Sequence, residues 1–444
     1  MSIEVLPWIE PVAAAAPLRE RPWAFLALSD GSPQARWSYL AWEPEATVRL
    51  DPGGGDPFAA LRGLTGADPL MSDVDEPPPF TGGGVGLLAY EAAGAFDRLD
   101  LPRATGWPDL FAARYARLLA FDHHRRRVLA IGGAVPPDPE APEPGPPSEA
   151  FTPEAPPDAY EAAVAEVVAR IGRGDLFQAN IAQAWSGRLR RGADPFDLFT
   201  RLTEASPAPY AAWWRLPGAA LVSQSPESFL SLEAEAGVRR VRARPIKGTR
   251  PRHPDPARDA ALAEDLTKSD KDRAENLMIV DLMRNDLARV CRPGTVHVEA
   301  LNALRTWPHV HHLESVVAGD LVDGVDAPAV LAAAFPPGSI TGAPKVEAMK
   351  VIAELERPRG PWCGSLALLA DGGAMEASVL IRTVGLLEDQ EGWRWRTLAG
   401  AGITADSDPA SERLETEAKI AAIRRALCGQ QLEQVIESDR RGRR

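Results

Sequence analysis

The chain has few cysteines, no long apolar run and no N-terminus typical of a secreted protein. Its three cysteines, Cys291, Cys363 and Cys428, form no CxxC pair and no even set, which predicts reduced thiols. No run of about eighteen apolar residues is present to cross a membrane. Residues 1–10 carry acidic residues and prolines, where a signal peptide has a basic region followed by an apolar run. These absences predict a cytoplasmic protein without a membrane partner.

A basic excess is also missing, because the formal net charge is −13 at pH 7. Nucleic acids and anionic membranes are bound through basic surfaces, so neither is expected as a partner. The basic residues near the C-terminus, within residues 431–444, are interpreted as a solvated tail. Apolar residues make up 45% of the chain and charged residues 25%, which is typical of a globular protein with a large core.

Known phosphate-binding motifs are absent as well. The glycine cluster at residues 82–86 lacks the spacing and the following helix of a dinucleotide fingerprint, and therefore predicts close backbone packing. The loop at residues 335–345 has the wrong spacing for a Walker A motif and a proline before Lys345. Its Gly, Ser and Thr residues, followed by a helix that opens at Pro344, favour backbone N–H groups that hold a carboxylate.

The pattern of apolar runs and turns divides the chain into four parts. Residues 1–132 alternate short apolar runs with Gly, Pro and Asp turns, which predicts short strands. Residues 133–157 are rich in Pro, Glu and Ala and predict an extended linker. Residues 158–430 open with a helix whose apolar residues recur at helical spacing from Tyr160 to Ile171, and the tail follows at 431–444.

One lysine stands in a stiff, short segment, Arg244-Pro245-Ile246-Lys247-Gly248-Thr249. Proline restricts the backbone before the lysine and glycine permits a tight turn after it, so the segment predicts a strand end, a lysine and a turn. An amine held there would be a nucleophile or a charge clamp, and an ordinary surface lysine is the alternative. Glu227, which follows Pro226 in an apolar strand, becomes interesting if it shares a cleft with Lys247.

Two predicted helices begin with pairs of carboxylates. Ser269 is a candidate cap for the first, whose Asp272 and Glu275 share a face, and its buried stripe is predicted to be Leu277, Val280, Met283 and Leu287. Asp408 is the candidate cap of the second, which carries Glu412, Glu415 and Lys419. If the two helix starts converge, four carboxylates would need a cation, and oxygen ligands point to Mg²⁺. If they do not, these are ordinary acidic first turns.

A histidine group and a lone arginine complete the candidates. Residues 309, 311 and 312 are histidines without a metal-binding spacing, although one of them could be catalytic. Residues 379–384 form an apolar run with Arg382 inside it, which predicts a single strand that aims a planar guanidinium at a buried anion.

These segments, taken in order, resemble the motifs of the chorismate-utilising enzymes. The matching words are GDLFQ (174–178), SPE (225–227), PIKGT (245–249), KDRAENLMIVDLMRND (271–286), VHHL (310–313), GSITGAPK (338–345), IRT (381–383) and AGAG (399–402). The match is dense from about residue 155 to 425 and loose over residues 1–132, so residues 158–430 would be the chorismate-binding catalytic region. Within the family, the resemblance is closest to the component I group of aminodeoxychorismate synthases.

The resemblance implies that ammonia replaces the 4-hydroxyl group of chorismate, which gives 4-amino-4-deoxychorismate on the way to p-aminobenzoate and folate. Relatives that add water to chorismate carry lysine at the position of Gln178, so glutamine there favours ammonia. Relatives that form anthranilate usually have alanine in place of Lys247 and tyrosine in place of Trp362.

The resemblance also implies roles for single residues. Glu275 and Glu415 would bind Mg²⁺, with Asp272 and Glu412 behind them or bound through water. Glu227 would protonate the departing hydroxyl group, His312 would lie against the ring, and Lys247 would attack C2 or act through its charge alone. Arg382, Gly402 and the Gly338 loop would bind the enolpyruvyl carboxylate. The predicted substrate contacts are Gln178, Gly248, Thr249, Gly338, Ser339, Thr341, Trp362, Arg382, Gly402 and Lys419.

The fold implied by the resemblance is α+β, with two large antiparallel β-sheets packed as a sandwich, helices outside, and both halves of the chain contributing. No Cys/His/Glu constellation of a glutaminase is visible, so a separate glutamine amidotransferase subunit is expected to supply ammonia. Two alternatives remain. An anthranilate synthase component I would release pyruvate, and an inactive chorismate- or partner-binding subunit would have no need of a complete acid and metal set.

Overall fold

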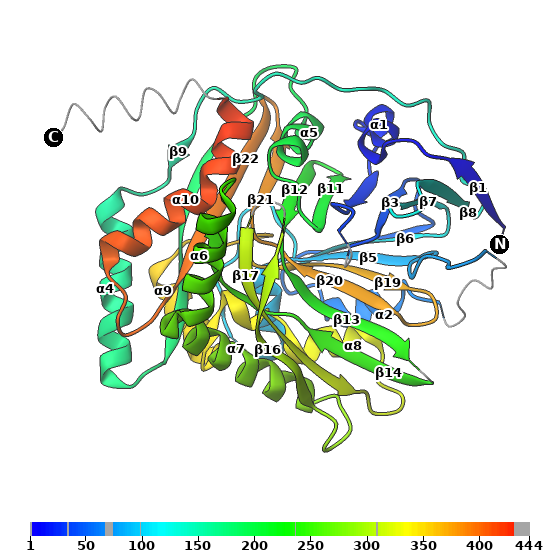
Figure 1. Cartoon of the computed structure of the whole chain (residues 1–444). Helices are drawn as coiled ribbons and strands as arrows, with labels where there is room; N and C mark the ends of the chain where they lie inside the picture. Colours follow the sequence, from blue (N-terminus) through cyan, green and yellow to red (C-terminus); the bar gives the residue numbers. More distant parts are fainter. Residues whose placement is uncertain are drawn as a thin grey trace.

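Two large antiparallel β-sheets form the body of the protein. The computed structural model of the chain describes residues 2–32, 35–66, 74–97, 99–235, 237–307 and 310–429. The predicted tail at 431–444 and residue His309 lie outside these ranges. Over the described residues the sheets have 12 and 10 strands, and helices lie around them (Figure 1). The predicted α+β architecture is confirmed.

The 12-stranded sheet joins strands from both halves of the chain. Phe25 of β2 stands opposite Trp214 of β11, so the N-terminal strands continue the sheet of the C-terminal half. Within the described residues the spatial order is β1 (Ile3–Pro7), β8 (Arg127–Ile131), β7 (Leu118–Asp122), β3 (Trp37–Ala41), β2 (Phe25–Leu28), β11 (Tyr210–Leu216), β12 (Ala219–Ser225), β21 (Thr383–Asp389), β22 (Gly392–Ile403), β10 (Gln178–Arg188) and β18 (Gly342–Ala343), with β9 (Thr152–Pro153) beside β10.

The 10-stranded sheet also combines strands from both halves of the chain. Its described strands are β15 (Ile246–Pro251), β17 (Val310–Asp320), β14 (Val238–Ala243), β13 (Ser228–Glu235), β20 (Met375–Val379), β19 (Ser365–Ala370), β5 (Gly83–Leu88), β6 (Leu110–Tyr115) and β4 (Ala46–Leu50), with β16 (His297–Thr306) beside β17. A Cβ atom on Gly83 would stand 2.1 Å from the carbonyl oxygen of Leu369. The glycine cluster therefore serves close backbone packing, as predicted.

An apolar core fills the space between the two sheets. Trp214 and Leu221 of the 12-stranded sheet pack in one cluster with Val85 and Phe111 of the 10-stranded sheet, and all four are almost fully buried. Burial of apolar surface is the main favourable contribution to folding, so this shared core holds both halves of the chain in one unit.

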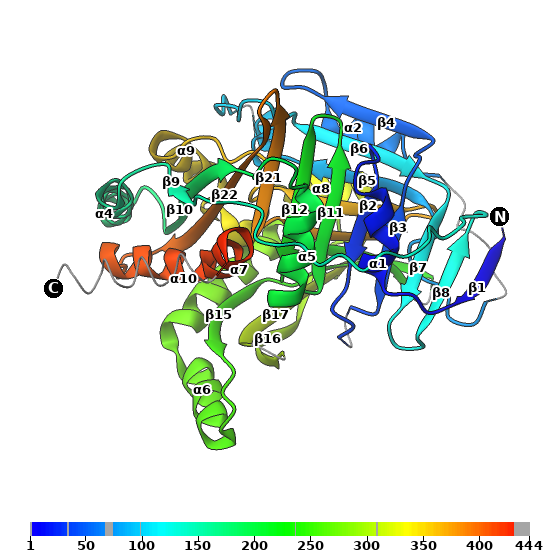
Figure 2. The same ribbon diagram turned by 90° about the horizontal axis from the view of Figure 1, so that it is seen from above.

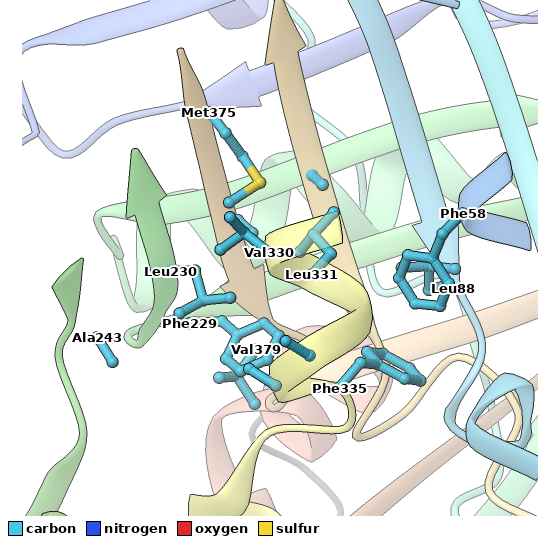
Figure 3. Close-up of a cluster of buried hydrophobic side chains, with 14 of the residues drawn as sticks. Phe58, Leu88, Phe229, Leu230, Ala243, Val330, Leu331, Phe335, Met375 and Val379 are labelled. Atoms are coloured by element: carbon cyan, nitrogen blue, oxygen red, sulfur yellow. The ribbon is translucent and has the colours of Figure 1, made fainter. Parts of the chain in front are cut away.

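The helices cover the outer faces and ends of the sheets. Figure 3 shows Val330 and Leu331 of α8 among Leu230, Met375 and Val379 of the 10-stranded sheet. Figure 2 shows α6 projecting from the body of the molecule. The described helices are α1 (Pro11–Ala15), α2 (Pro57–Arg62), α3 (Gly94–Asp97), α4 (Pro157–Arg173), α5 (Pro195–Ala205), α6 (Pro256–Lys268), α7 (Asp270–Ala288), α8 (Ala327–Ala334), α9 (Lys345–Leu355) and α10 (Pro409–Cys428), with the 3₁₀ helices η1 (Ala16–Leu18), η2 (Tyr90–Ala93) and η3 (Gly338–Ile340).

Both predicted helix caps are confirmed. The Ser269 side chain accepts the N–H of Asp272 at the start of α7, and the Asp408 side chain accepts the N–H of Ser411 at the start of α10. These caps fix the first turns, on which the paired carboxylates stand.

The predicted stripe of α7 is wrong at one position, because Leu277 is 53% exposed. The neighbouring Asn276 is buried instead. Its amide donates to the carbonyl of Leu313 and accepts from the hydroxyl of Ser315, which anchors the helix to β17. A polar anchor thus replaces an apolar one, and hydrophobic spacing could not indicate it.

The segment predicted as a linker follows the surface but is tied to the 12-stranded sheet. Ser148 is fully buried, pairs with Leu189 and accepts the indole N–H of Trp395 at 3.1 Å. Across the described residues, no helix is both long enough and apolar enough to span a lipid bilayer.

Candidate active site

A cavity of about 620 Å³ opens between β15, β17 and β22 and the helices α7 and α10. A cavity of this size can enclose a small molecule. Most of the predicted site residues line it, and they come from segments that are far apart in the sequence. They are Glu227, Lys247, Gly248, Thr249, Asp272, Glu275, His312, Ser339, Trp362, Arg382, Gly402, Glu412, Glu415 and Lys419.

Three predicted contacts lie behind the cavity wall. Gln178 is buried beside Gly402, where a Cβ atom would stand 2.3 Å from the Gln178 amide nitrogen. A Cβ atom on Gly338 would stand 2.6 Å from a methyl group of Leu282 in α7, so the loop packs tightly on that helix. The Thr341 hydroxyl donates to the carbonyl of Pro337 at 3.1 Å. Direct contact of Gln178, Gly338 and Thr341 with a ligand therefore stays a prediction.

Two adjacent crossings between the sheets carry Glu227 and Arg382. The chain leaves the 12-stranded sheet at the end of β12 and enters the 10-stranded sheet at β13, with Glu227 between them. It returns between β20 and β21, where Arg382 has a left-handed φ of 51°. The Glu227 carbonyl accepts the N–H of Val379, and the Arg382 carbonyl accepts the N–H of Gln224. The crossings are thus bonded side by side.

The prediction of one strand over residues 379–384 is therefore wrong, and Glu227 also lies between strands rather than within one. The apolar run is divided between two sheets, with Val379 in one and Thr383 in the other. Its apolar character persists because both strands are buried, so composition alone gave no sign of the break.

Glu227 is an acid with a strongly shifted protonation equilibrium. It is 5% exposed, and burial raises the pKa of its carboxyl group to about 7, while the Ser339 hydroxyl and the charge of Lys247 lower it. A carboxyl group that stays protonated near neutral pH can donate a proton to a leaving group.

Lys247 lies in β15 rather than at the end of a strand. The pairing of β15 with β17 shifts register between Lys247 and Thr249, which is a β-bulge at Gly248. Gly248 has φ of 67°, and a Cβ atom there would stand 2.9 Å from the carboxyl carbon of Asp272. The predicted turn is thus a bulge, and it places Lys247 over the start of α7.

The Lys247 amine is shifted toward its neutral form. Its Nζ donates to the carbonyl of Ser339 at 3.1 Å. Burial lowers the pKa of the amine, whereas the charges of Glu275 and Glu227 oppose this. A neutral amine is the form that can act as a nucleophile.

His312 is a neutral imidazole. Burial lowers the pKa of its ring to about 4. Its Nδ1 lies 3.2 Å from the carbonyl oxygen of Gly248, which can only accept, and 2.9 Å from the hydroxyl of Thr249. Nδ1 is therefore assigned the proton, and Nε2 is left as an acceptor.

Among the described residues, Arg382 presents a guanidinium group without a countercharge. Burial lowers the pKa of Arg382, and within the described part of the chain no charged group raises it. A partly buried guanidinium of this kind at a cavity is suited to bind a carboxylate in a bidentate manner.

The opposite side of the cavity is acidic and carries two lysines. Burial raises the pKa of Glu275, while Lys247 and Lys271 lower it. Lys271 Nζ lies 4.0 Å from Glu275. Glu415 pairs with Lys419 at 2.7 Å. Partial burial raises the pKa of Glu415, but the charge and hydrogen bond of Lys419 outweigh it and hold the pKa below its usual value. The two acidic helix starts do converge on one cavity.

The donor set suits a hard cation only in part. Among the described residues, no group of three or more potential ligands is close enough together to hold a metal ion. Asp272 lies 3.4 Å from Arg250, and Glu412 accepts from Ser407 at 2.8 Å and from Lys271 at 3.4 Å. Mg²⁺ commonly uses one or two carboxylates together with water and substrate oxygens, and a pair of carboxylates fits that pattern. The magnesium site stays a prediction.

Two of the cavity residues without a predicted role could have been found from the sequence. Asn180 lines the cavity, and its Oδ1 has no hydrogen-bond partner among the described residues. Strand alternation from Gln178 would have indicated it, since i and i+2 share a face. Lys271 lies one helical turn before Glu275, which is the spacing that pairs side chains on a helix.

Comparison with known proteins shows the family of the chain. A family model described as chorismate binding enzyme matches residues 25–425. Anthranilate synthase component 1 of Streptomyces coelicolor is 40% identical over 88% of this chain and 81% of that protein. Aminodeoxychorismate synthase component 1 of Salmonella typhimurium is 37% identical over 95% of this chain and 97% of that protein. The crystal structure of anthranilate synthase component I from Streptococcus pneumoniae has a TM-score of 0.75 and 29% identity, covering 88% and 93% of the two chains. The chain therefore belongs to the chorismate-binding enzymes and acts on chorismate.

Proposed function

We propose that the chain is the synthase component of an aminodeoxychorismate synthase, which converts chorismate and ammonia into 4-amino-4-deoxychorismate and water. The observation that carries this choice is the Lys247 amine, which is partly buried at the cavity beside Glu227. Relatives at similar identity carry both component names, so similarity alone does not choose between the two reactions. Lys247 stands where enzymes that form anthranilate usually have alanine.

The neighbouring acid and amine can perform the substitution in two steps. Glu227 gives its proton to the 4-hydroxyl group, which leaves as water, while the neutral Lys247 amine bonds to C2 and the ring double bond shifts. The new ammonium group returns a proton to Glu227. Ammonia then bonds to C4 while Glu227 protonates the lysine nitrogen, whose bond to C2 breaks, and the added nitrogen gives a proton back to Glu227.

A second role for Lys247 needs no covalent bond, because its charge could stabilise the departing oxygen. The two roles differ in a measurable way. Intact-protein mass spectrometry after incubation with chorismate and Mg²⁺ without ammonium should show an adduct that is absent in Lys247→Met. Absence of an adduct under conditions of turnover would leave only the electrostatic role.

The charges around the cavity match the two carboxylates of chorismate. Arg382 is suited to the enolpyruvyl carboxylate because its guanidinium lacks a countercharge among the described residues. Glu275 and Glu415 are the carboxylates that would hold Mg²⁺, which neutralises the ring carboxylate when bound. His312 supplies a neutral face against the ring.

Ammonia is proposed to come from a separate glutamine amidotransferase subunit. The similar proteins are named as first components, which supports a partner. Gln178 suits a neutral nucleophile, because its buried Oε1 has no hydrogen-bond partner among the described residues and can accept from ammonia. Purified chain should use ammonium but not glutamine, and glutamine-dependent activity of the chain alone would contradict this. We place the enzyme in the cytoplasm, where its three buried free cysteines stay reduced.

One reaction mixture tests the proposed function. Purified chain is incubated with chorismate, Mg²⁺ and ammonium, and the product mass is determined. We expect 4-amino-4-deoxychorismate with no pyruvate. Anthranilate together with one equivalent of pyruvate would instead assign the reaction of the Streptomyces coelicolor relative. Binding of chorismate without any conversion would leave only the inactive subunit.

A further inference from the structure

A buried ion pair lies just outside the cavity and has no part in the proposed chemistry. The side chains of Arg359 and Glu356 are 1% and 6% exposed. They form two hydrogen bonds, from Nε and Nη2 of the guanidinium to the two carboxylate oxygens, each 3.0 Å long. Such a bidentate pair has a fixed geometry.

The ion pair is bonded to the backbone of two cavity walls. Arg359 donates to the carbonyl of Asn180 in β10 at 2.6 Å and to the carbonyl of Ile340 in η3 at 3.0 Å. Glu356 accepts the N–H of Ala182 in β10 at 2.7 Å. Both Asn180 and Ile340 line the cavity. The pair therefore continues the hydrogen bonding along the edge of β10 beyond β18, whose pairing with β10 reaches Ala179.

The same guanidinium stacks against a third wall. Its Cζ lies 5.2 Å from the ring centre of Trp362, which lines the cavity, and 4.7 Å from that of Tyr90. The indole N–H of Trp362 has no hydrogen-bond partner among the described residues. The ring position is thus set by packing and by Arg359 rather than by a hydrogen bond.

A second carboxylate holds the backbone of Arg359 itself. Glu91 is 4% exposed and accepts the N–H of Arg359 at 2.5 Å and the N–H of Gly360 at 3.1 Å. Arg359 is therefore anchored at its backbone and at the end of its side chain. Three wall segments of the cavity therefore contact one guanidinium group that is held in place.

We propose that Arg359 is a positioning residue that sets the places of Asn180, Ile340 and Trp362 around the substrate. A buried ion pair contributes little net stability, because desolvation offsets much of its attraction. The four hydrogen bonds that the Arg359 guanidinium donates, and its contacts with the two rings, instead fix the positions of the cavity walls. A displacement of about 1 Å in a site can cost a hundredfold in rate. The proposal rests on chorismate turnover but not on which product forms.

The principal test is Arg359→Lys, scored as chorismate consumed per folded protein. Lysine keeps the charge and one bond to Glu356, but it loses the planar fork and the stacking. We expect kcat to fall about tenfold to a hundredfold. KM for chorismate should change less than about threefold, because Arg382 and the acidic side are untouched. A purely structural role would lower the melting temperature and leave kcat per folded protein unchanged.

Arg114→Lys is the matched control. Arg114 also makes a bidentate pair, with Asp371 at 2.8 and 2.9 Å, and donates to the carbonyl of Leu64 at 2.9 Å, but it does not line the cavity. We expect a comparable change in stability with kcat unchanged. Equal kcat in both variants and in wild type would overturn the proposal, whatever product the wild type forms.

A second variant keeps the test decisive if Arg359→Lys does not fold. The double variant Arg359→Gln with Glu356→Gln removes both charges at similar volume and leaves no unpaired buried ion. We expect the double variant to fold with kcat lowered at least tenfold. Chemical rescue is a further measurement: Arg359→Ala should regain part of its kcat with millimolar guanidinium but not with methylammonium. Wild-type kcat in the folded double variant would contradict the positioning role.

Discussion

Two groups of buried and partly buried charged side chains lie side by side in this protein and differ in how they are paired. The cavity cluster contains Glu227, Lys247 and Arg382, and the support cluster contains Glu91, Glu356 and Arg359. In the support cluster every charged group makes hydrogen bonds within the chain. In the cavity cluster Lys247 donates to a single carbonyl, and Arg382 has no countercharge among the described residues.

Burial has the same effect on one carboxyl group of each cluster. It raises the pKa of Glu227 and of Glu91 to about 7. A shifted pKa therefore does not by itself identify the catalytic acid. The difference lies in the space in front of the group: Glu227 lines a cavity, whereas both oxygens of Glu91 are occupied by backbone N–H groups.

Unpaired buried charge is costly, so its presence at the cavity indicates where the substrate completes the pairing. Paired buried charge instead fixes the walls. Loss of a cavity group should therefore change the rate or the metal affinity, and loss of a group that only holds backbone should change stability.

The largest effect is expected from Glu227→Gln. Glutamine fills the same space but cannot protonate the leaving hydroxyl group, so kcat should fall about a thousandfold. The dissociation constant of chorismate, measured by calorimetry, should stay within about threefold. The matched control is Glu376→Gln, since burial also raises the pKa of Glu376 to about 7 but this side chain lines a different cavity. Full activity of the Glu227 variant would remove this residue from the mechanism.

The pH profile should show the same acid. Proton donation requires the protonated carboxyl group, whose pKa is about 7, so kcat/KM should fall about tenfold per pH unit above that value. Initial rates from pH 5 to 9 at saturating Mg²⁺ measure this dependence. A flat profile between pH 7 and 9 would contradict the assignment of Glu227.

A smaller effect, on metal affinity, is expected from Glu275→Gln. Loss of one carboxylate charge should raise the Mg²⁺ concentration for half-maximal activity at least tenfold, and chelator treatment of wild type should abolish turnover. Calorimetric titration of Mg²⁺ in the presence of chorismate gives the second readout. Asp281→Asn is the control on the same helix, because Asp281 is exposed and pairs with Arg284. Equal Mg²⁺ dependence in the two variants would count against Glu275 as a ligand.

The smallest effect on rate is expected from Glu91→Gln, which should act on stability. The folded pKa of about 7 lies above the ordinary value of 4.5, so the folded state binds the extra proton, and wild type loses stability as pH rises from about 4.5 to 7. Glutamine removes this loss. Relative to wild type, the variant should therefore gain about 2 kcal/mol between pH 5 and 8, measured by urea unfolding. A pH-independent difference would show that Glu91 does not titrate in this window.

The sequence alone predicted the local features and the family. Ser269 and Asp408 cap their helices because a cap forms between residues two or three positions apart, which the chain order already brings together. The identities of Lys247, Gln178 and Trp362 needed no fold to be noticed. The α+β architecture followed from ordered motifs rather than from periodicity.

Only the tertiary structure decided where the chain passes between sheets and which charges meet. An apolar run has the same composition whether one strand or two adjoining buried strands contain it. The sequence therefore could not predict the break at Arg382 or the position of Glu227 between two strands. Arg359 is 179 positions from Asn180 and 268 from Glu91, and no local pattern links residues so far apart. Side-chain chemistry is set by the sequence, but the pairing of buried charges, and hence their pKa values and roles, depends on contacts that exist only after folding.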